Sequence, residues 1–469
     1  MAADYGIAVA PLTRPRYSQP LSDQPVTRRQ AIAGISAAVA GLAVPDWSSA
    51  PLLGANAAQS GARTFPRPEA YGGWRKGDAR TLGMNPDRLR EAVKYHDESI
   101  VTTSYGGALV IIYKGYLVSE TYTSGTEGGP QPWTASTCND MKSSTSSVFG
   151  TAVGVFLDQY RSRVTLESTL VGTSAKDSLI PQIWDQPITD PRKMQIKIKH
   201  ALSMTSGHET REPGLAPNRR VLSEGYAASF QMYEYCFGWW QFDGIPGQHT
   251  LRFDPGSTFY YSNFGLEQVA LAMRNIAKQE VGPYVYDRVL RHIGMLLTLR
   301  TNQYIDLPYT DSRELNFDAS AGWGRGGGWG CNAYGADGSD SPIGYNSVAG
   351  STFRCTARDF ARLAYLWLNE GRWEQKQLVP AAWMKLATRP FVRENGDTPN
   401  NYGYTFWTHK GEPGVPDDIF MSLGHNVNHS YVSPSLDLVV VRQGNDNRRV
   451  PGDTPFQTAL IQKIVAAIA

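Results

Sequence analysis

The sequence predicts an α+β protein in which strands from both ends of the chain form one antiparallel sheet around an inserted region. Apolar runs at 107–113 and 116–122, joined by Lys114-Gly115, predict a hairpin near the amino-terminal end. Strand-like runs at 427–433 and 436–442 predict a second hairpin near the other end. Between them, over about 142–400, the patterns are mostly helical, and this order is typical of an α+β arrangement.

Helical spacing of apolar residues defines the other elements. It predicts helices over 86–99, 142–160, 283–293, 356–369 and 456–468, and a short strand lies at 406–408. The stretch 306–346 is rich in Gly, Asp, Tyr and Trp. Its Gly-rich run lacks the Gly-Lys-Ser/Thr ending of a phosphate loop, so we expect a loop that lines a cleft. Four tryptophans could stack on a sugar or aryl ligand, or could simply pack in the core and loops: Trp239, Trp240, Trp323 and Trp329.

Composition excludes several classes of function. The 469 residues are 41% hydrophobic, which is enough apolar material for a large core. Lysine and arginine number 45 against 43 acidic residues, and this balance argues against nucleic acid as a partner. No stretch is apolar for long enough to predict a stable membrane span.

The first 57 residues have the layout of a secretory signal. Thr27-Arg28-Arg29-Gln30 precedes a mildly apolar run at 31–44, and Ala55-Asn56-Ala57 suits signal peptidase. The paired arginines are similar to those of a twin-arginine signal. We therefore expect a signal peptide at 1–57, a lead-in at 58–84 and a folded domain at 85–469, exported to the periplasm or secreted.

The cysteines are few for an exported chain. Cys138, Cys236, Cys331 and Cys355 permit up to two disulfides, and the sequence does not give their pairing. One disulfide or none is the simpler expectation. No C-x-x-C spacing occurs, so no zinc ribbon is predicted, and no cofactor or metal is implied.

Five features follow one another in a fixed order along the chain. After the first hairpin come Leu202-Ser203-Met204-Thr205-Ser206-Gly207, Phe253-Asp254-Pro255-Gly256-Ser257-Thr258-Phe259-Tyr260-Tyr261-Ser262-Asn263, Ala349-Gly350-Ser351 leading into Thr356-Ala357-Arg358-Asp359-Phe360-Ala361-Arg362, and Gly424-His425 followed by Pro434-Ser435-Leu436-Asp437. Together they resemble the serine β-lactamase and penicillin-binding-protein superfamily. Within this superfamily, the chain resembles the branch that includes class C β-lactamases, D-alanyl-D-alanine carboxypeptidases, and related esterases and amidases. The resemblance covers about 85–469 and implies a β-lactamase-like fold.

The resemblance also implies a Ser-x-x-Lys pair at the start of the first long helix. Residues three apart share a helix face, so the amine would reach the hydroxyl. In this register the chain reads Asn139-Asp140-Met141-Lys142, which keeps Lys142 and places Asn139 at the nucleophile position. A carboxamide nitrogen is a poor nucleophile because its lone pair is delocalised into the carbonyl. The chain therefore lacks the residue that would form an acyl-enzyme.

Four explanations compete. The chain is a natural non-catalytic relative, a sequence variant of an active enzyme, an enzyme with another nucleophile, or an enzyme that needs no acyl-enzyme. Cys138, Ser143 and Ser146 are the candidates for another nucleophile. A Cys138 thiolate beside Lys142 is chemically sensible, although a buried or disulfide-bonded cysteine is the simpler expectation.

Further site residues follow from the resemblance. Tyr261 would carry protons with a pKa lowered by Lys142, or else is a core aromatic, and Asn263 would hold Lys142 or a substrate carbonyl. The third family element, Lys or His, then any residue, then Gly, reads His425-Asn426-Val427. Val427 would crowd that strand edge, unless the register slips to Asn428-His429-Ser430. A metal pair of His425 and His429 is not predicted, because side chains four apart do not converge in a strand or turn.

The sequence thus predicts a β-lactamase-related protein that acts on or binds an ester, amide or β-lactam-like carbonyl compound. Lys142, Tyr261, His425 and the nucleophile position Asn139 are the candidate catalytic residues. Asn263, Asn426, Trp323 and Trp329 are the candidate substrate-binding residues. The alternative is a non-catalytic binding protein for a peptidoglycan-like or small acyl ligand.

Overall fold

The computed structural model describes most of the region that follows the expected signal peptide. The described residues are 63–101, 106–124, 133–181, 188, 190–208, 250–279, 281–295, 329–330, 349–350, 353–391, 401–408, 411–444 and 457–468. The expected signal peptide, Trp239, Trp240 and Trp323 lie outside them. None of the helices described within these ranges is long and apolar enough to cross a membrane.

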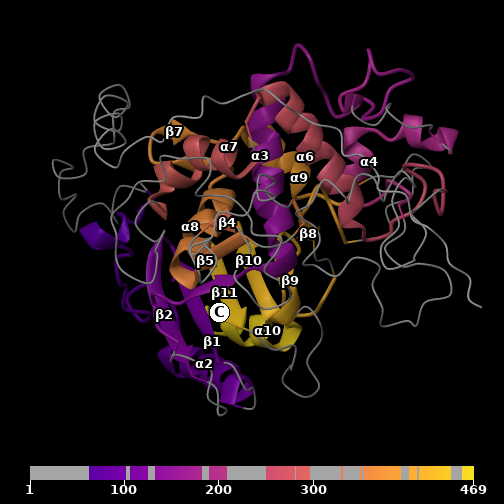
Figure 1. Ribbon diagram of the computed structural model, residues 1–469. Coiled ribbons are helices and arrows are strands. Elements are labelled where there is room, and N and C mark those ends of the chain that lie inside the picture. Colours follow the sequence, from indigo (N-terminus) through magenta and orange to yellow (C-terminus); the bar gives the residue numbers. More distant parts are fainter. Residues whose placement is uncertain are drawn as a thin grey trace, which may run out of the picture. The chain divides into compact units, whose positions relative to one another are not determined.

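A six-stranded antiparallel sheet is the centre of the fold. Its order is β2-β1-β11-β10-β9-β8. The strands are β1 (Gly107–Tyr113), β2 (Tyr116–Thr123), β8 (Trp407–Thr408), β9 (Phe420–Gly424), β10 (Asn428–Ser433) and β11 (Leu438–Gly444). β1 pairs with β11 along its whole length, from Gly107 opposite Gly444 to Tyr113 opposite Leu438. Figure 1 shows the purple β1 and β2 adjoining the yellow β11, so the predicted pairing of the two ends of the chain is confirmed.

Helices cover both faces of this sheet. Along β1, Val110 and Ile112 face a core shared with the helices α3 (Thr145–Gln159) and α8 (Ala357–Leu368). Leu109 and Ile111 face a second core with α2 (Pro86–Val101) and α10 (Thr458–Ala466). Successive side chains on a strand point to opposite faces. A strand buried on both faces must therefore be apolar at every position, which explains the continuous apolar run of β1.

Most of the predicted helices are present with small shifts of their ends. The helices are α2 (Pro86–Val101), α3 (Thr145–Gln159), α4 (Ile198–Leu202), α6 (Asn263–Ala277), α7 (Val281–Arg288), α8 (Ala357–Leu368), α9 (Ala381–Ala387) and α10 (Thr458–Ala466). Short 3₁₀ turns are η2 (Glu69–Tyr71), η3 (Lys142–Ser144), η5 (Pro191–Gln195), η6 (Leu290–Ile293) and η9 (His425–Val427). The helix predicted over 283–293 is divided between α7 and η6.

Local capping explains two helix starts. The Asn85 side chain accepts the N–H groups of Asp87 and Arg88 at the start of α2, and Pro86 takes the first helical position. Thr356 Oγ1 accepts the N–H of Asp359 at the start of α8. In the first hairpin, Lys114 and Gly115 both have positive φ, 51° and 80°, as a two-residue turn between twisted strands requires.

A second, smaller sheet was not predicted. It has the order β3-β5-β4, with β3 (Cys138–Asp140), β4 (Trp329–Gly330) and β5 (Phe353–Thr356), and a separate pair joins β6 (Arg372–Trp373) to β7 (Lys376–Gln377). The sequence analysis predicted a loop up to about Cys138 and placed Asn139 to Lys142 at the start of the first long helix. Strands of two to four residues are too short to show an alternating pattern.

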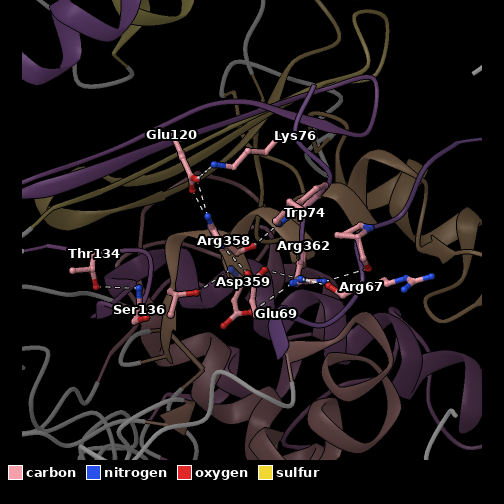
Figure 2. A network of polar contacts seen from close by, with 12 residues as sticks. Arg67, Glu69, Trp74, Lys76, Glu120, Thr134, Ser136, Arg358, Asp359 and Arg362 are labelled. Carbon is pink, nitrogen blue, oxygen red and sulfur yellow. Dashed lines mark hydrogen bonds and ion pairs between the residues drawn. The ribbon is translucent and has the colours of Figure 1, made fainter. Parts of the chain in front are cut away.

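The described part of the lead-in, 63–84, belongs to the domain. Trp74 and Met84 are buried, and Lys76 forms a strand bridge with Leu117. A network of ion pairs fixes this segment to α8, and Figure 2 shows Arg358 between Glu120 and Glu69. The folded region therefore begins upstream of the expected boundary at residue 85.

The network contains a buried guanidinium. Arg358 binds both carboxylate oxygens of Glu120, at 2.8 Å and 2.7 Å, and reaches Glu69 at 2.8 Å. The fully buried Arg362 contacts the other oxygen of Glu69 at 2.7 Å. Glu69 thus joins the two arginines, which lie one helical turn apart.

Candidate functional site

Asn139 is a strand residue. It pairs with Cys355 of β5, and its side chain is buried. Its Nδ2 donates to Asn428 Oδ1 at 2.8 Å and to the Gly444 carbonyl at 3.1 Å. The expectation that residues 139 and 142 share a helix face is wrong, because β3 ends at Asp140 and helical structure starts after Asn139.

Asp140 holds both ends of Lys142. Asp140 Oδ1 accepts the backbone N–H of Lys142 at 2.8 Å, and Oδ2 lies 2.9 Å from Lys142 Nζ. Lys142 has a φ of 52°, a left-handed conformation that is uncommon for residues other than glycine. The Lys142 ammonium is therefore paired with a carboxylate of the preceding strand.

The serine-rich run forms the start of the long helix. Ser144 Oγ donates to the Asn428 carbonyl at 2.6 Å, and Ser147 Oγ donates to the Thr405 carbonyl at 2.7 Å. The 143–147 run is buried from Ser144 onward, and Ser146 is only 2% exposed. Ser143 is partly exposed. Within this run, Ser143 is thus the hydroxyl that a molecule from solvent can approach.

The third family element lies in a strained turn between β9 and β10. His425 is exposed, whereas Asn426 and Val427 have φ values of 59° and 56°. Glycine adopts such angles easily and a β-branched residue does not, so Val427 keeps the backbone of a glycine at a conformational cost. Asn428, His429 and Ser430 lie in β10. His425-Asn426-Val427 therefore forms the turn, and the slipped register does not.

This turn closely approaches the start of the helical segment. A Cβ at Gly424 would lie 2.1 Å from the Met141 carbonyl oxygen, so only glycine is accommodated there. Val427 is buried, with Cγ2 3.1 Å from where a Cβ of Gly444 would lie. The Val427 side chain, which was predicted to crowd the edge of the cleft strand, therefore packs against Gly444 at the end of β11.

Tyr261 lies in an aromatic cluster at the edge of the sheet. Its ring stacks on Trp407 at a centroid distance of 6.1 Å and meets Tyr402 edge-on at 6.3 Å. Trp407 belongs to β8, which pairs with β9, and β9 ends at the strained turn. Tyr261 is therefore connected through β8 and β9 to the turn that holds His425.

Asn263 is placed at the first position of α6. A Cβ at Gly350 would lie 2.4 Å from Asn263 Cγ, so this glycine allows the Ala349-Gly350 segment to approach the asparagine. One helical turn later, Glu267 Oε1 accepts the N–H groups of Ala349 at 2.8 Å and Gly350 at 3.2 Å. Burial raises the pKa of Glu267 to about 8, and the two backbone donors oppose this rise.

Sequence reasoning missed Glu267, and it named Asn428 only as part of the alternative register Asn428-His429-Ser430. The available signal for Glu267 was a charged residue within the apolar run of α6, where an ionisable side chain needs a partner. The contacts of Asn428 with Asn139 and Gly444 could not be predicted, because these partners are distant in the sequence.

The structure brings part of the predicted site together. Asn139 and the 425–427 turn contact Asn428, whereas Lys142 is paired with Asp140. Asn263 is the first residue of α6, and Tyr261 lies two residues before it. Trp329 contributes backbone to β4, while Trp323 lies outside the described residues.

Neither described cysteine is available as a nucleophile. Cys138 is disulfide-bonded, in agreement with the simpler expectation. Cys355 is a buried free thiol whose pKa is raised by burial. In the described ranges, no group of three or more His, Cys, Asp or Glu side chains is placed to hold a metal ion. His429, one member of the histidine pair considered above, has its Nδ1 2.8 Å from the Tyr431 hydroxyl.

Comparison with known proteins defines the class. The sequence model of the beta-lactamase family matches residues 101–461. The chain therefore belongs to the beta-lactamase family. No functionally curated protein matches the sequence.

Several solved structures share the fold at low identity. EstCE1, a hydrolase with promiscuous acyltransferase activity, is 15% identical with a TM-score of 0.54, and the match covers 83% of this chain and 99% of EstCE1. A penicillin-binding protein homologue from Caulobacter crescentus is 16% identical with a TM-score of 0.53, covering 82% and 99%. A family VIII carboxylesterase is 16% identical with a TM-score of 0.51, covering 84% and 98%. The β-lactamase-like fold is thereby shown, and family membership supports a hydrolase-like function.

Proposed function

We propose that this protein binds an ester, amide or β-lactam-like carbonyl compound at the amino-terminal end of the α3 segment, and that Ser143 is the group that attacks the carbonyl. The observation that carries the proposal is the position of Ser143. It is the partly exposed hydroxyl of the 143–147 run, and it lies in the turn that leads into a long helix.

Helix geometry supports this position. The dipole of a long helix favours negative charge near its amino-terminal end, and Ser143 lies two residues before α3. A carbonyl oxygen that gains negative charge during attack is stabilised in such a field. Asn139 lies instead in β3 with its amide engaged, so position 139 is poorly placed for attack.

Non-catalytic binding is the second candidate, and the residue at i+3 favours it. Three positions after Ser143 stands Ser146 rather than a lysine, and the Lys142 amine is paired with Asp140. A serine hydroxyl without a neighbouring base is a weak nucleophile. Acylation of Ser143 is therefore expected to be slow, and binding without acylation is what the second candidate predicts. Tyr261 is the proposed proton carrier, and His425, Asn426 and Asn263 are the proposed ligand contacts.

Intact-mass spectrometry tests the assignment. The mature protein would be incubated with activated esters and a penicillin, beside Ser143→Ala, Asn139→Ser and the control Ser168→Ala, which changes a partly exposed serine in a remote loop. We expect an adduct on the native and Ser168→Ala proteins and none on Ser143→Ala.

Each other outcome has a defined meaning. An adduct that persists on Ser143→Ala removes Ser143 as the acylated residue, and peptide mapping then identifies the true one. An adduct confined to Asn139→Ser restores position 139 as the nucleophile position of a disabled enzyme. No adduct on any protein favours the binding candidate, which equilibrium binding of the same penicillin then tests.

We also propose that the protein is exported. The paired arginines Arg28 and Arg29 and the Ala55-Asn56-Ala57 sequence support export. The disulfide at Cys138 supports it independently, because disulfides persist in oxidising compartments.

A further inference from the structure

Asn428 is a fully buried asparagine at the first position of β10, and its side chain connects three segments of the site. Its Nδ2 donates to the His425 carbonyl at 2.8 Å and to the Gly444 carbonyl at 2.9 Å. Its Oδ1 accepts from Asn139 Nδ2 at 2.8 Å and from the Gly444 N–H at 3.2 Å. Both ends of the amide are therefore satisfied, as burial demands.

The main chain of Asn428 extends the same connections. Its carbonyl accepts the hydrogen bond from Ser144 Oγ, in the turn before α3, at 2.6 Å. Ser422 Oγ of β9 in turn donates to the Ser144 carbonyl at 3.1 Å. One residue thus contacts both the turn that presents His425 and the segment that presents Ser143.

The turn needs such a contact because its backbone is strained. Two consecutive residues, Asn426 and Val427, have left-handed φ, which is an outlier for a β-branched side chain. Strained conformations of this kind persist only where surrounding contacts fix them. The hydrogen bond from Asn428 to the His425 carbonyl spans the turn and helps to close it, beside the strand pairing of Asn428 with Gly424.

Asn139 supports the orientation of the Asn428 amide. An asparagine amide can rotate by half a turn and exchange its oxygen and nitrogen. The backbone N–H of Gly444 and the carbonyls of His425 and Gly444 select the orientation in which Oδ1 faces the N–H and Nδ2 faces the carbonyls, and Asn139 Nδ2 adds a second donor to Oδ1. Asn139 therefore acts on the turn through Asn428.

We propose that Asn428 is a positioning residue of this site, which sets the His425–Val427 turn against the start of α3, and that Asn139 helps to hold its amide in the required orientation. The inference deepens the proposed function, since it concerns the same site. It also gives the asparagine at position 139 a role of its own, distinct from that of a lost nucleophile.

The test uses Asn-to-Asp variants, which preserve size and replace donors with acceptors. Asn428→Asp places an acceptor opposite two carbonyl oxygens, and Asn139→Asp places one opposite Asn428 Oδ1. The matched control is Asn275→Asp, where Asn275 Nδ2 donates to the remote Leu179 carbonyl at 3.0 Å. Hydrogen–deuterium exchange of full-length mature protein is measured by mass spectrometry on peptides that cover 425–428, 142–147 and the β1 reference 107–113.

We expect exchange over 425–428 to rise about 10-fold or more in Asn428→Asp, since each lost buried hydrogen bond shifts local opening by about that factor. A smaller rise is expected in Asn139→Asp, and none in Asn275→Asp or in β1. Lowering the pH protonates the new carboxyl group and restores a donor. The ratio of variant to native exchange should then return toward one, which a general loss of packing would not produce.

Unchanged exchange over 425–428 in a folded Asn428→Asp protein overturns the proposal, as does an equal rise in β1. If Asn428→Asp does not fold, Asn139→Asp and its pH response decide alone. Labelling with the activated ester is measured separately. A native protein that is never acylated refutes the Ser143 assignment, while the exchange data still decide the role of Asn428.

Discussion

At the scale of single residues, the main finding is that resemblance to a motif did not fix the geometry of the motif. Lys142 and Asn139 occupy a Ser-x-x-Lys spacing in the sequence, yet one begins a 3₁₀ turn and the other lies in a strand. A spacing of three has chemical meaning only when both residues lie on one helix. The sequence could not reveal this, because β3 is three residues long and its pairing partner β5 is distant in the chain.

Val427 offers a direct test of backbone strain. At a φ of 56°, glycine is favoured over alanine by roughly 1 kcal/mol, because a left-handed conformation brings Cβ close to the carbonyl oxygen. We therefore expect Val427→Gly to be more stable than Val427→Ala by about that amount in chemical denaturation. At Val441, in the regular strand β11, the order should reverse. If the alanine variant were the more stable one at position 427 as well as at position 441, the turn would be unstrained.

Glu267 predicts how stability depends on pH. Burial raises the pKa of its carboxyl from 4.5 to about 8, so the folded state binds a proton that the unfolded state has released within this range. The unfolding free energy should thus decrease as pH rises from about 4.5 to 8, by roughly 5 kcal/mol, and level off beyond. Glu267→Gln keeps an acceptor for Ala349 and Gly350 and should lack this decrease. The exposed Glu91→Gln should retain it, and an equal slope in all three proteins would contradict the assignment.

At the scale of elements, long patterned segments were predictable and short ones were not. The apolar runs of β1 and β11 and the spacing of α2, α8 and α10 indicated these elements to within a few residues. β3, β5 and the 425–427 turn depend on contacts between distant segments, and a single sequence contains no direct record of such contacts. The motif around Tyr261 was recognisable, whereas its stacking on Trp407 was not.

The ion-pair network between the lead-in and α8 is expected to matter for stability. Glu69→Ala would remove the carboxylate that lies 2.7 Å from the fully buried guanidinium of Arg362 and leave it only the more distant Asp359, at 3.8 Å. Removing one partner of a buried pair costs about 3 kcal/mol, measured as a loss of unfolding free energy in urea. The exposed pair of Arg161 and Asp158 is the control, since its arginine is 79% exposed and Arg161→Ala should cost less than about 0.5 kcal/mol. If Glu69→Ala and Arg161→Ala lost similar amounts of unfolding free energy, burial of the network would add nothing to the stability of the fold.

At the scale of the whole molecule, export is the prediction that remains to be tested. Replacing Arg28 and Arg29 by lysine should retain the protein inside the cell, because a twin-arginine signal depends on that pair. Replacing Arg14 and Arg16 in the same way is the control and should leave export intact. Cell fractionation with immunodetection shows whether each variant is retained inside the cell or exported. Retention of both proteins, or export of both, would argue against this route.

The pairing of β1 with β11 also determines the order in which the chain can fold. Gly107 and Gly444 are neighbours in the sheet although most of the chain lies between them. During synthesis the β1–β2 hairpin emerges early, and the edge of β1 that belongs to β11 stays unpaired until almost the whole chain has been made. Contacts of such long range form slowly, and an unpaired apolar strand edge promotes aggregation. The yield of folded protein should therefore depend on what shields that edge while the ribosome completes the chain.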